Sequence, residues 1–274
     1  MQLDPAAAAA GFGLLTHSTL ASTNAEALAY GGRHRGADRV WVAAKTQTAG
    51  RGRSGRGWVS PPGNLYATLL LRDPAPPART PELSFVAGLA VHDAILDCAP
   101  GLRSWLALKW PNDLLGAGSK LAGILIEAEG LDGALAVAVG IGVNCVHHPA
   151  HTAFPATDLA SAGANVSAAD LFAALSRTMM LRLAQWRRGD GFASVRADWL
   201  AQAVGIGGEM RVRLPQRELF GRCEGLDEAG RLVLRLAHGG LETIAAGDIF
   251  PLGGRERLRR FADRADRKNG HGAK

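Results

Sequence analysis

Cysteine is scarce in this sequence, and its spacing excludes two kinds of small-domain scaffold. The three cysteines, Cys98, Cys145 and Cys223, lie far apart, their number is odd, and none belongs to a Cys-x-x-Cys pair. Disulfide frameworks and zinc knuckles both depend on paired or closely spaced cysteines. We therefore expect neither, and a reducing cytoplasmic environment fits the sequence best.

Long uncharged apolar runs are also missing. The longest, residues 133–143, is too short to cross a bilayer as a helix, which takes about 20 residues. The first residues, MQLDPAAAAAGFG, lack the basic start and the apolar centre of a secretory signal. The sequence therefore predicts no membrane segment and no signal peptide.

The excess of positive charge is confined to one end of the chain. The formal net charge is +6, but residues 255–274 hold eight Lys and Arg against three Asp and Glu, so this tail carries +5 and the rest about +1. A protein that binds nucleic acid usually carries its basic residues on the folded body. We interpret the tail as a solvated end, with polyanion binding as the alternative.

The pattern of apolar residues predicts two structural regions. In the first, strands are expected at residues 40–45, 65–71, 106–110, 121–127 and 134–143, the last of them central. Capping patterns predict helices that start near Thr23, at Thr80 with Pro81 in the first turn, and at Ser167, and another helix is expected at residues 192–203. After Gly205, four or five short alternating runs predict a small β-barrel.

The strongest local signal is residues 50–58, GRGRSGRGW. Glycines let a backbone approach a ligand closely, and Arg51, Arg53 and Arg56 can converge on a phosphate or a carboxylate. Trp58 offers a flat face to a base. The alternative is a disordered RNA-binding arm, but such arms are usually repeated and terminal, whereas this segment is single and internal. We therefore favour an ordered anion-binding loop.

A second signal is KWPND at residues 109–113, followed by Lys120 just before an apolar strand. Pro111 favours an extended approach and then a turn, where Asn112 and Asp113 can bond to the backbone or to a ligand. From its position, Lys120 could reach an α-phosphate. A plain hairpin with a surface lysine explains the segment equally well.

Three weaker patterns complete the set. GIGVN at residues 140–144 is no dinucleotide fingerprint, because the third glycine is replaced by Cys145, so these glycines would admit a ligand and Asn144 would contact it. Ser22, Thr23 and Asn24 stand at a helix start, where they could cap the helix, bind a polar ring, or do both. The His147, His148 and His151 cluster lacks a carboxylate or cysteine to complete a metal site.

Taken in order, these motifs closely resemble the biotin protein ligases from about Thr16 to Leu252. The resemblance implies an α/β (α+β) catalytic domain related to the class II aminoacyl-tRNA synthetases, at residues 1–204. It also implies a C-terminal SH3-like β-barrel at residues 205–254, with the basic tail at 255–274. About fifteen residues precede the similar region, too few for the winged helix that bifunctional members carry, so we expect the monofunctional type.

The resemblance also implies roles for individual residues. Those expected to bind biotin are Ser22, Thr23, Asn24, Gln47, Arg51, Gly52, Arg53, Lys120 and Gly123. Those expected to bind ATP or the adenylate are Arg51, Arg53, Arg56, Trp58, Asn112, Lys120 and Asn144. Lys120, Arg53 and Asp113 are expected to be catalytic, and no metal site on the protein is expected.

The implied activity is an ATP-dependent ligation that forms biotinyl-5′-AMP with Mg²⁺ and then biotinylates one lysine of a carboxylase's carrier domain. The resemblance further implies a cytoplasmic monomer or homodimer without DNA or membrane partners. Three alternatives stay open: a lipoate or octanoate transferase on the same fold, a nucleic-acid-binding repressor, and an inactive biotin-binding module. The complete arginine loop and Lys120 argue against the first and the last.

Overall fold

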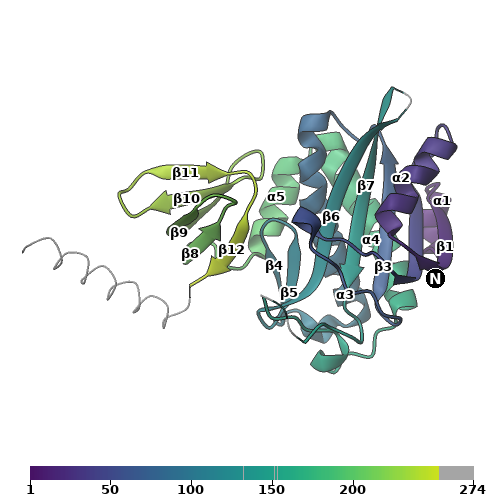
Figure 1. The fold of residues 1–274 in the computed structure, drawn as a ribbon, viewed down its shortest axis with the longest axis horizontal. Helices are drawn as coiled ribbons and strands as arrows, with labels where there is room; N and C mark the ends of the chain where they lie inside the picture. The colour runs from purple at the N-terminus through teal and green to yellow at the C-terminus, as the bar shows by residue number, and fades with distance from the viewer. Residues whose placement is uncertain (132, 151, 153, 253–274) are drawn as a thin grey trace, which may run out of the picture. The chain divides into compact units, whose positions relative to one another are not determined.

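The computed structural model describes residues 1–131, 133–150, 152 and 154–252, so the basic tail and His151 lie outside the described residues. By its internal contacts the chain divides into two compact units, Met1–Ala203 and Val204–Lys274 (Figure 1). Among the described residues no helix has both the length and the apolar character needed to cross a membrane.

The first unit is built on a sheet of seven strands among its described residues, in the order β1-β2-β3-β7-β6-β5-β4 (Figure 1). Only β1 and β2 pair in parallel. The central strand is β7, as the sequence predicted. The bounds are β1 Gly13–Leu20, β2 Val40–Gln47, β3 Leu65–Arg72, β4 Leu106–Lys109, β5 Asp113–Gly116, β6 Ser119–Leu131 and β7 Ala134–Val143.

Helices cover both faces of this sheet. Successive side chains of a strand point to opposite faces. On β2, Trp41 therefore packs edge-on against Phe172 of one helix, with ring centroids 5.5 Å apart, while Val42 packs in a cluster with Ala27 of another. The helices are α1 Pro5–Ala9, α2 Thr23–Arg33, α3 Leu83–Cys98, α4 Ala168–Trp186 and α5 Phe192–Ala201.

The helix starts test the capping patterns. Ser167 caps α4 through the backbone N–H of Asp170, as predicted. The cap of α2 is Ser22 rather than Thr23, because it is the Ser22 hydroxyl that accepts from the third N–H of the helix. The prediction at Thr80 was wrong: a 3₁₀ turn, Pro77–Glu82, comes first and contains Pro81, and α3 begins only at Leu83.

The described residues of the second unit form a five-stranded antiparallel sheet of the SH3-like type, in the order β11-β10-β9-β8-β12. Its strands are β8 Glu209–Arg213, β9 Glu218–Leu226, β10 Leu232–Leu236, β11 Leu241–Ile244 and β12 Asp248–Pro251. Alternate residues such as Met210, Val212 and Leu234 form its core. Of the four or five alternating runs expected after Gly205, five are strands, and bends at residues 245–246 separate β11 from β12.

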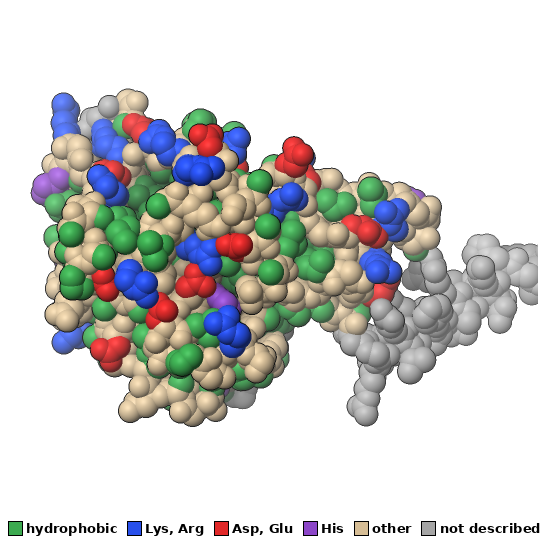
Figure 2. Space-filling model, turned by 180° about the vertical axis from the view of Figure 1, so that it is seen from behind, with side chains coloured by type: hydrophobic (Ala, Val, Ile, Leu, Met, Phe, Trp, Pro, Cys, Tyr) green, Lys and Arg blue, Asp and Glu red, His purple; other side chains and the backbone are tan. Residues whose placement is uncertain are grey.

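Charged side chains of both signs are interspersed on the face that Figure 2 shows. This agrees with a described body whose net charge is close to neutral. The positive charge of the sequence therefore does not form one continuous basic area on that face.

A buried asparagine fixes the chain as it leaves the central strand. Asn64 is 2% exposed, and its Oδ1 accepts from the backbone N–H groups of Cys145, Val146 and His147 at 2.9, 3.0 and 3.1 Å. Its Nδ2 donates to the His147 carbonyl at 2.8 Å. One side chain thus satisfies four backbone groups of the segment that follows β7.

We expect the substitution Asn64→Leu to lower the free energy of unfolding by about 3 kcal/mol, because it leaves these buried groups without partners. Urea unfolding followed by far-ultraviolet circular dichroism measures the change. The control is Asn165→Leu, on an exposed asparagine, which should change the free energy of unfolding by less than about 0.5 kcal/mol. A loss below about 1 kcal/mol for Asn64→Leu would contradict the assignment.

Candidate functional site

Four polar residues meet where α2 begins beside the end of β2. The backbone N–H of Thr23 donates to Gln47 Oε1 at 2.8 Å, and Gln47 Nε2 donates to Ser60 Oγ at 3.0 Å. Ser22, Thr23 and Asn24 are all buried. Because its oxygen and its nitrogen each have a partner, the carboxamide of Gln47 has a defined orientation. The structure therefore brings Ser22, Thr23, Asn24 and Gln47 together, as the sequence suggested.

Asn24 is the most constrained member of this group. Its Oδ1 lies 2.6 Å from the hydroxyl of Thr68 on β3, and its Nδ2 donates to the Leu125 carbonyl at 3.3 Å and to Glu127 Oε2 at 2.7 Å. Beneath it, Gly140 is required, since a Cβ there would lie 2.2 Å from Asn24 Oδ1. The first glycine of GIGVN thus admits a protein side chain to the sheet surface.

The glycine- and arginine-rich segment forms a short hairpin. Arg51 and Gly57 form an antiparallel bridge, and the N–H of Gly52 donates to the Arg56 carbonyl at 2.7 Å. Ser54 and Gly55 at its tip both have positive φ, 55° and 71°, as the two central residues of a type I′ turn require. The short side chain and the glycine at these two positions therefore suit the turn.

The three arginines of the hairpin reach different partners. Arg51 donates to both carboxylate oxygens of Glu127, at 3.2 and 3.4 Å. Arg53 donates to Asn112 Oδ1 at 3.0 Å, and Arg56 donates through Nε to the carbonyl of Arg53 at 3.2 Å. The first two contacts tie the hairpin to β6 and to the turn before β5, the two elements predicted to carry the chemistry.

Lys120 lies beside a carboxylate that it shares with a second lysine. Lys120 Nζ is 2.7 Å from Asp113 Oδ1, and Lys109 Nζ is 3.8 Å from Asp113 Oδ2. Lys109 is buried and also lies 3.8 Å from the centroid of the Phe154 ring. The KWPND segment therefore joins Lys120 in one cluster of two cations and one anion.

Trp58 lies over two glycines of the paired strands β6 and β7. Gly123 and Gly142 are directly opposite each other in the ladder, and a Cβ on either would lie 3.2 and 2.6 Å from the indole, respectively. Lys120 Nζ is 5.5 Å from the Trp58 ring. The two glycines thus provide a floor on which the indole of Trp58 lies, within reach of Lys120.

Asn144 lies at the same end of β7, but its side chain is buried. Its Nδ2 donates to the Thr157 carbonyl at 3.0 Å. The segment it holds pairs with Lys120, whose N–H donates to the Pro155 carbonyl at 2.7 Å and whose carbonyl accepts from Thr157 at 3.0 Å. In the structure Asn144 therefore supports the backbone around Lys120.

Sequence reasoning missed two residues of this site, Thr68 and Glu127. Thr68 is fully buried, and it stands in an otherwise apolar run, where it can pass for a strand-forming residue. Glu127 ends the apolar run that follows Lys120. A polar residue inside a run of buried apolar residues was the available signal, because such a residue needs a partner.

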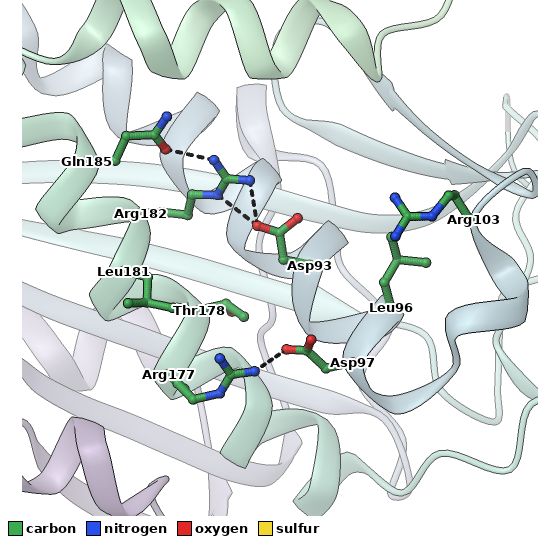
Figure 3. A pocket seen from close by; sticks show the side chains of 9 residues that line it. All are labelled: Asp93, Leu96, Asp97, Arg103, Arg177, Thr178, Leu181, Arg182 and Gln185. Carbon is green, nitrogen blue, oxygen red and sulfur yellow. Dashed lines mark hydrogen bonds and ion pairs between the residues drawn. The ribbon is translucent and has the colours of Figure 1, made fainter.

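Two other features lie outside this site. A hollow between α3 and α4 is lined by charged residues that pair with one another, such as Arg177 with Asp97 and Arg182 with Asp93, both through atoms less than 3 Å apart (Figure 3). His148 Nδ1 lies 2.5 Å from Asp158 Oδ2. Within the described ranges no group of three or more His, Cys, Asp or Glu residues could hold a metal ion.

The arrangement defines a class of site. A buried polar pocket, a glycine floor and the cations Lys120, Arg51 and Arg53 lie together on one end of the sheet. Fixed cations can hold a carboxylate and a phosphate close to each other, which the two anions alone would resist. The site therefore suits an enzyme that activates a carboxylic acid on a nucleotide.

Known proteins with the same sequence features agree with this class. The Biotin/lipoate A/B protein ligase family matches residues 32–144, and the Biotin protein ligase C terminal domain matches residues 205–250. A biotin–[acetyl-CoA-carboxylase] ligase from Paracoccus denitrificans is 41% identical over 84% of this chain and 96% of its own length. A second such ligase, from Mycobacterium tuberculosis, is 35% identical over 84% of this chain and 86% of its own length. This chain belongs to the biotin protein ligase family.

Solved structures agree in fold. The biotin protein ligase from Aquifex aeolicus, in complex with biotin and ATP, superposes with a TM-score of 0.74 over 88% of this chain and 99% of that one, at 24% identity. The biotin protein ligase from Leishmania major, in complex with biotinyl-5-AMP, superposes with a TM-score of 0.63 over 85% of this chain and 99% of that one, at 27% identity. The catalytic-domain and SH3-like architecture predicted from the sequence is confirmed.

The contact between His148 and Asp158 predicts how the stability of the fold changes at acid pH. Burial alone would raise the pKa of Asp158, but hydrogen bonds from His148 and from the backbone of Ser161 outweigh it, and the net pKa is lowered. A carboxylate with a lowered folded-state pKa stabilises the fold above its ordinary pKa, and this stability is lost as the pH falls through the folded-state value.

We therefore expect Asp158→Asn to lower the melting temperature at pH 7, and the difference from the unmodified protein to shrink below about pH 4. Differential scanning fluorimetry from pH 7 to pH 3 measures it. The control is Asp38→Asn, on a half-exposed carboxylate far along the chain. If the difference in melting temperature between the two proteins stayed constant from pH 7 to pH 3, the charge of Asp158 would contribute nothing to the stability of the fold.

Proposed function

We propose that this protein is an ATP-dependent biotin protein ligase that makes biotinyl-5′-AMP and transfers the biotinyl group to a lysine of a biotin carboxyl carrier domain. The observation that carries the proposal is the convergence of Lys120, the arginine hairpin and the buried polar pocket around the glycine floor of β6 and β7. Membership of the family supports the same activity.

In the first half-reaction, a carboxylate oxygen of biotin bonds to the α-phosphorus of ATP, and the bond to pyrophosphate breaks. The pocket of Ser22, Thr23, Asn24 and Gln47 would hold the ring of biotin, with Gly123 beneath its chain. Lys120 would contact the biotin carboxylate and the α-phosphate together, where its charge offsets their repulsion. Arg51, Gly52 and Arg53 would close over the two reacting groups, and an acyl phosphate in water-poor surroundings is protected from hydrolysis.

The nucleotide would lie farther along the floor. Trp58 supplies an aromatic face beside Gly142, against which adenine can stack. Arg56 and Asn112 approach from the hairpin and from the turn before β5, and Asn144 would act here through the backbone it supports around Lys120. ATP would thus lie with its α-phosphate toward Lys120.

In the second half-reaction, the amine of the acceptor lysine bonds to the acyl carbon, and AMP leaves. The amine must first lose its proton, since free lysine titrates near ~10.4. We assign this task, or the orientation of the amine, to Asp113, whose carboxylate already faces two ammonium groups, those of Lys109 and Lys120. A carboxylate has four lone-pair sites, so that of Asp113 can accept a further hydrogen bond from the acceptor amine.

Magnesium would enter with ATP. The described residues offer no cluster of three or more acidic, histidine or cysteine side chains to hold a metal ion. The ion would therefore be carried on the phosphate oxygens, and the residue roles above do not depend on a metal held by the protein.

The acceptor is proposed to be the carrier domain of acetyl-CoA carboxylase or of a related carboxylase, the substrate in the name of the Paracoccus relative. We also propose a cytoplasmic monomer or homodimer that binds no DNA. The use of ATP and three cysteines without disulfide partners fit that compartment.

The chemical identity of the acid is the first test, because the matched catalytic family includes lipoate enzymes. Pyrophosphate release from ATP is measured with biotin, with lipoate and with no acid. We expect release with biotin alone. Release with lipoate alone would replace the proposal by a lipoate ligase, and release with neither would favour the inactive binding module.

The second test removes one cation. We expect Lys120→Ala to lower biotin-dependent pyrophosphate release by at least about a thousandfold, because removing a group that stabilises transition-state charge typically costs 10²–10³ and Lys120 is assigned contacts to two anions. The matched control is Lys45→Ala, an exposed lysine on β2, which should leave the rate within about twofold. Near-normal release by Lys120→Ala would refute the role of Lys120.

A further inference from the structure

Glu127 occupies an unusual position in this site, between a buried side chain and an exposed one. Its Oε2 accepts from Asn24 Nδ2 at 2.7 Å, and both of its oxygens accept from Arg51 at 3.2 and 3.4 Å. The Arg51 side chain is 47% exposed, the Glu127 side chain 31%, and Asn24 is 4% exposed as a residue. The carboxylate therefore joins the floor of the polar pocket to the hairpin above it.

The hydrogen bonds of Asn24 show why this link matters for the pocket. An amide nitrogen has two hydrogens, and those of Asn24 are given to the Leu125 carbonyl and to Glu127. Its Oδ1 lies 2.6 Å from the Thr68 hydroxyl, whose proton it can accept, so one lone pair of that oxygen is left for a ligand. Asn24 thus faces the ligand only as an acceptor, and Glu127 and Thr68 hold it in that orientation.

The other two arginines of the hairpin have different partners. Arg53 donates to Asn112, and Arg56 donates to the carbonyl of Arg53. Arg51 is the first arginine of the segment and stands at the base of the hairpin, where it pairs with Gly57. A contact at the base controls the direction in which the whole hairpin leaves the sheet.

We propose that Glu127 is a positioning residue that couples the biotin pocket to the arginine hairpin: its carboxylate orients the Asn24 amide and anchors Arg51, so that both are correctly placed together. The inference rests on the proposed function, because it assigns a consequence for biotin binding. Only a carboxylate fits the position. It accepts from two donors at once, whereas glutamine has one acceptor oxygen and would direct its own N–H groups at Asn24 or Arg51.

The chain offers a matched control on the same strand. Glu129 lies two residues beyond Glu127 on β6, is exposed, and can lose its charge in the same way. Both Glu127→Gln and Glu129→Gln change the net charge by one unit within the same strand. A difference between the two variants therefore reports the contacts of Glu127 rather than the charge of the region.

The first measurement is the biotin dependence of pyrophosphate release at saturating ATP. We expect Glu127→Gln to raise KM for biotin about five- to tenfold, as loss of a charge-assisted hydrogen bond would, and to change kcat less than about twofold. Glu129→Gln should change both less than about twofold. An equal effect of the two variants on KM, or a Glu127→Gln effect on kcat alone, would overturn the proposal.

The second measurement reads the hairpin directly. Trypsin cleaves after arginine, and Arg51, Arg53 and Arg56 all lie in the hairpin. We expect cleavage in this segment, followed by mass spectrometry, to be several times faster in Glu127→Gln than in Glu129→Gln, with equal urea midpoints. Equal cleavage rates would overturn the coupling even if KM changed.

A double substitution separates coupling from two independent losses. Arg51→Gln combined with Glu127→Gln should raise KM for biotin by clearly less than the product of the two single effects, because the contact between the two residues is lost in both single variants. Fully multiplicative effects would overturn the proposal. Failure of the proposed function is distinguishable: the unmodified protein would then release no pyrophosphate with biotin, while the trypsin comparison would still test the anchoring of Arg51.

Discussion

The site depends on the absence of side chains at three positions of two adjacent strands. Gly140, Gly142 and Gly123 lie on β7 and β6, and a Cβ at the first two would lie 2.2 and 2.6 Å from the atoms that cover them. Both distances are shorter than real Cβ contacts allow, whereas a Cβ at Gly123 would lie 3.2 Å from the Trp58 indole, a tight contact. The central strands of a sheet normally carry β-branched residues, and β7 does so elsewhere along its length. The glycines therefore give up strand stability locally so that Asn24 and Trp58 can reach the sheet surface.

On that floor, the arrangement follows from which groups can donate and which can accept. Asn24, Arg51 and Lys120 are donors, and each faces a carboxylate, Glu127 for the first two and Asp113 for the third. Carboxylates accept from several donors at once, so two acidic residues suffice to orient a site whose substrates are both anions. Glu127 and Asp113 also hold Arg51 and Lys120 in fixed positions, whereas positive charges without such partners would repel one another.

Much of this could be predicted from the sequence, and the residues that could not share a physical property. The hairpin residues, Lys120 and Asp113 stand in short motifs rich in glycine, proline and charge, which draw attention to them even where, as for Lys120, a plain hairpin explains the segment equally well. Thr68 and Glu127 stand in strands, and a strand pattern gives the face of a residue but not its partner on another element. Their partners lie 44 and 103 positions away in the chain, at Asn24. Such contacts depend on the register of the sheet, which local patterns do not specify.

The errors at helix starts have a related origin. A hydroxyl can cap a helix from either of two adjacent positions, and the choice between Ser22 and Thr23 is made by Gln47, which takes the N–H and lies near the hydroxyl of Thr23. With Thr23 engaged by β2, Ser22 is left to accept from the helix. The cap and the pocket are therefore one arrangement: the residue that begins α2 is decided by the same hydrogen bonds that prepare the polar pocket. A functional constraint thus determines a structural detail that propensity alone leaves open.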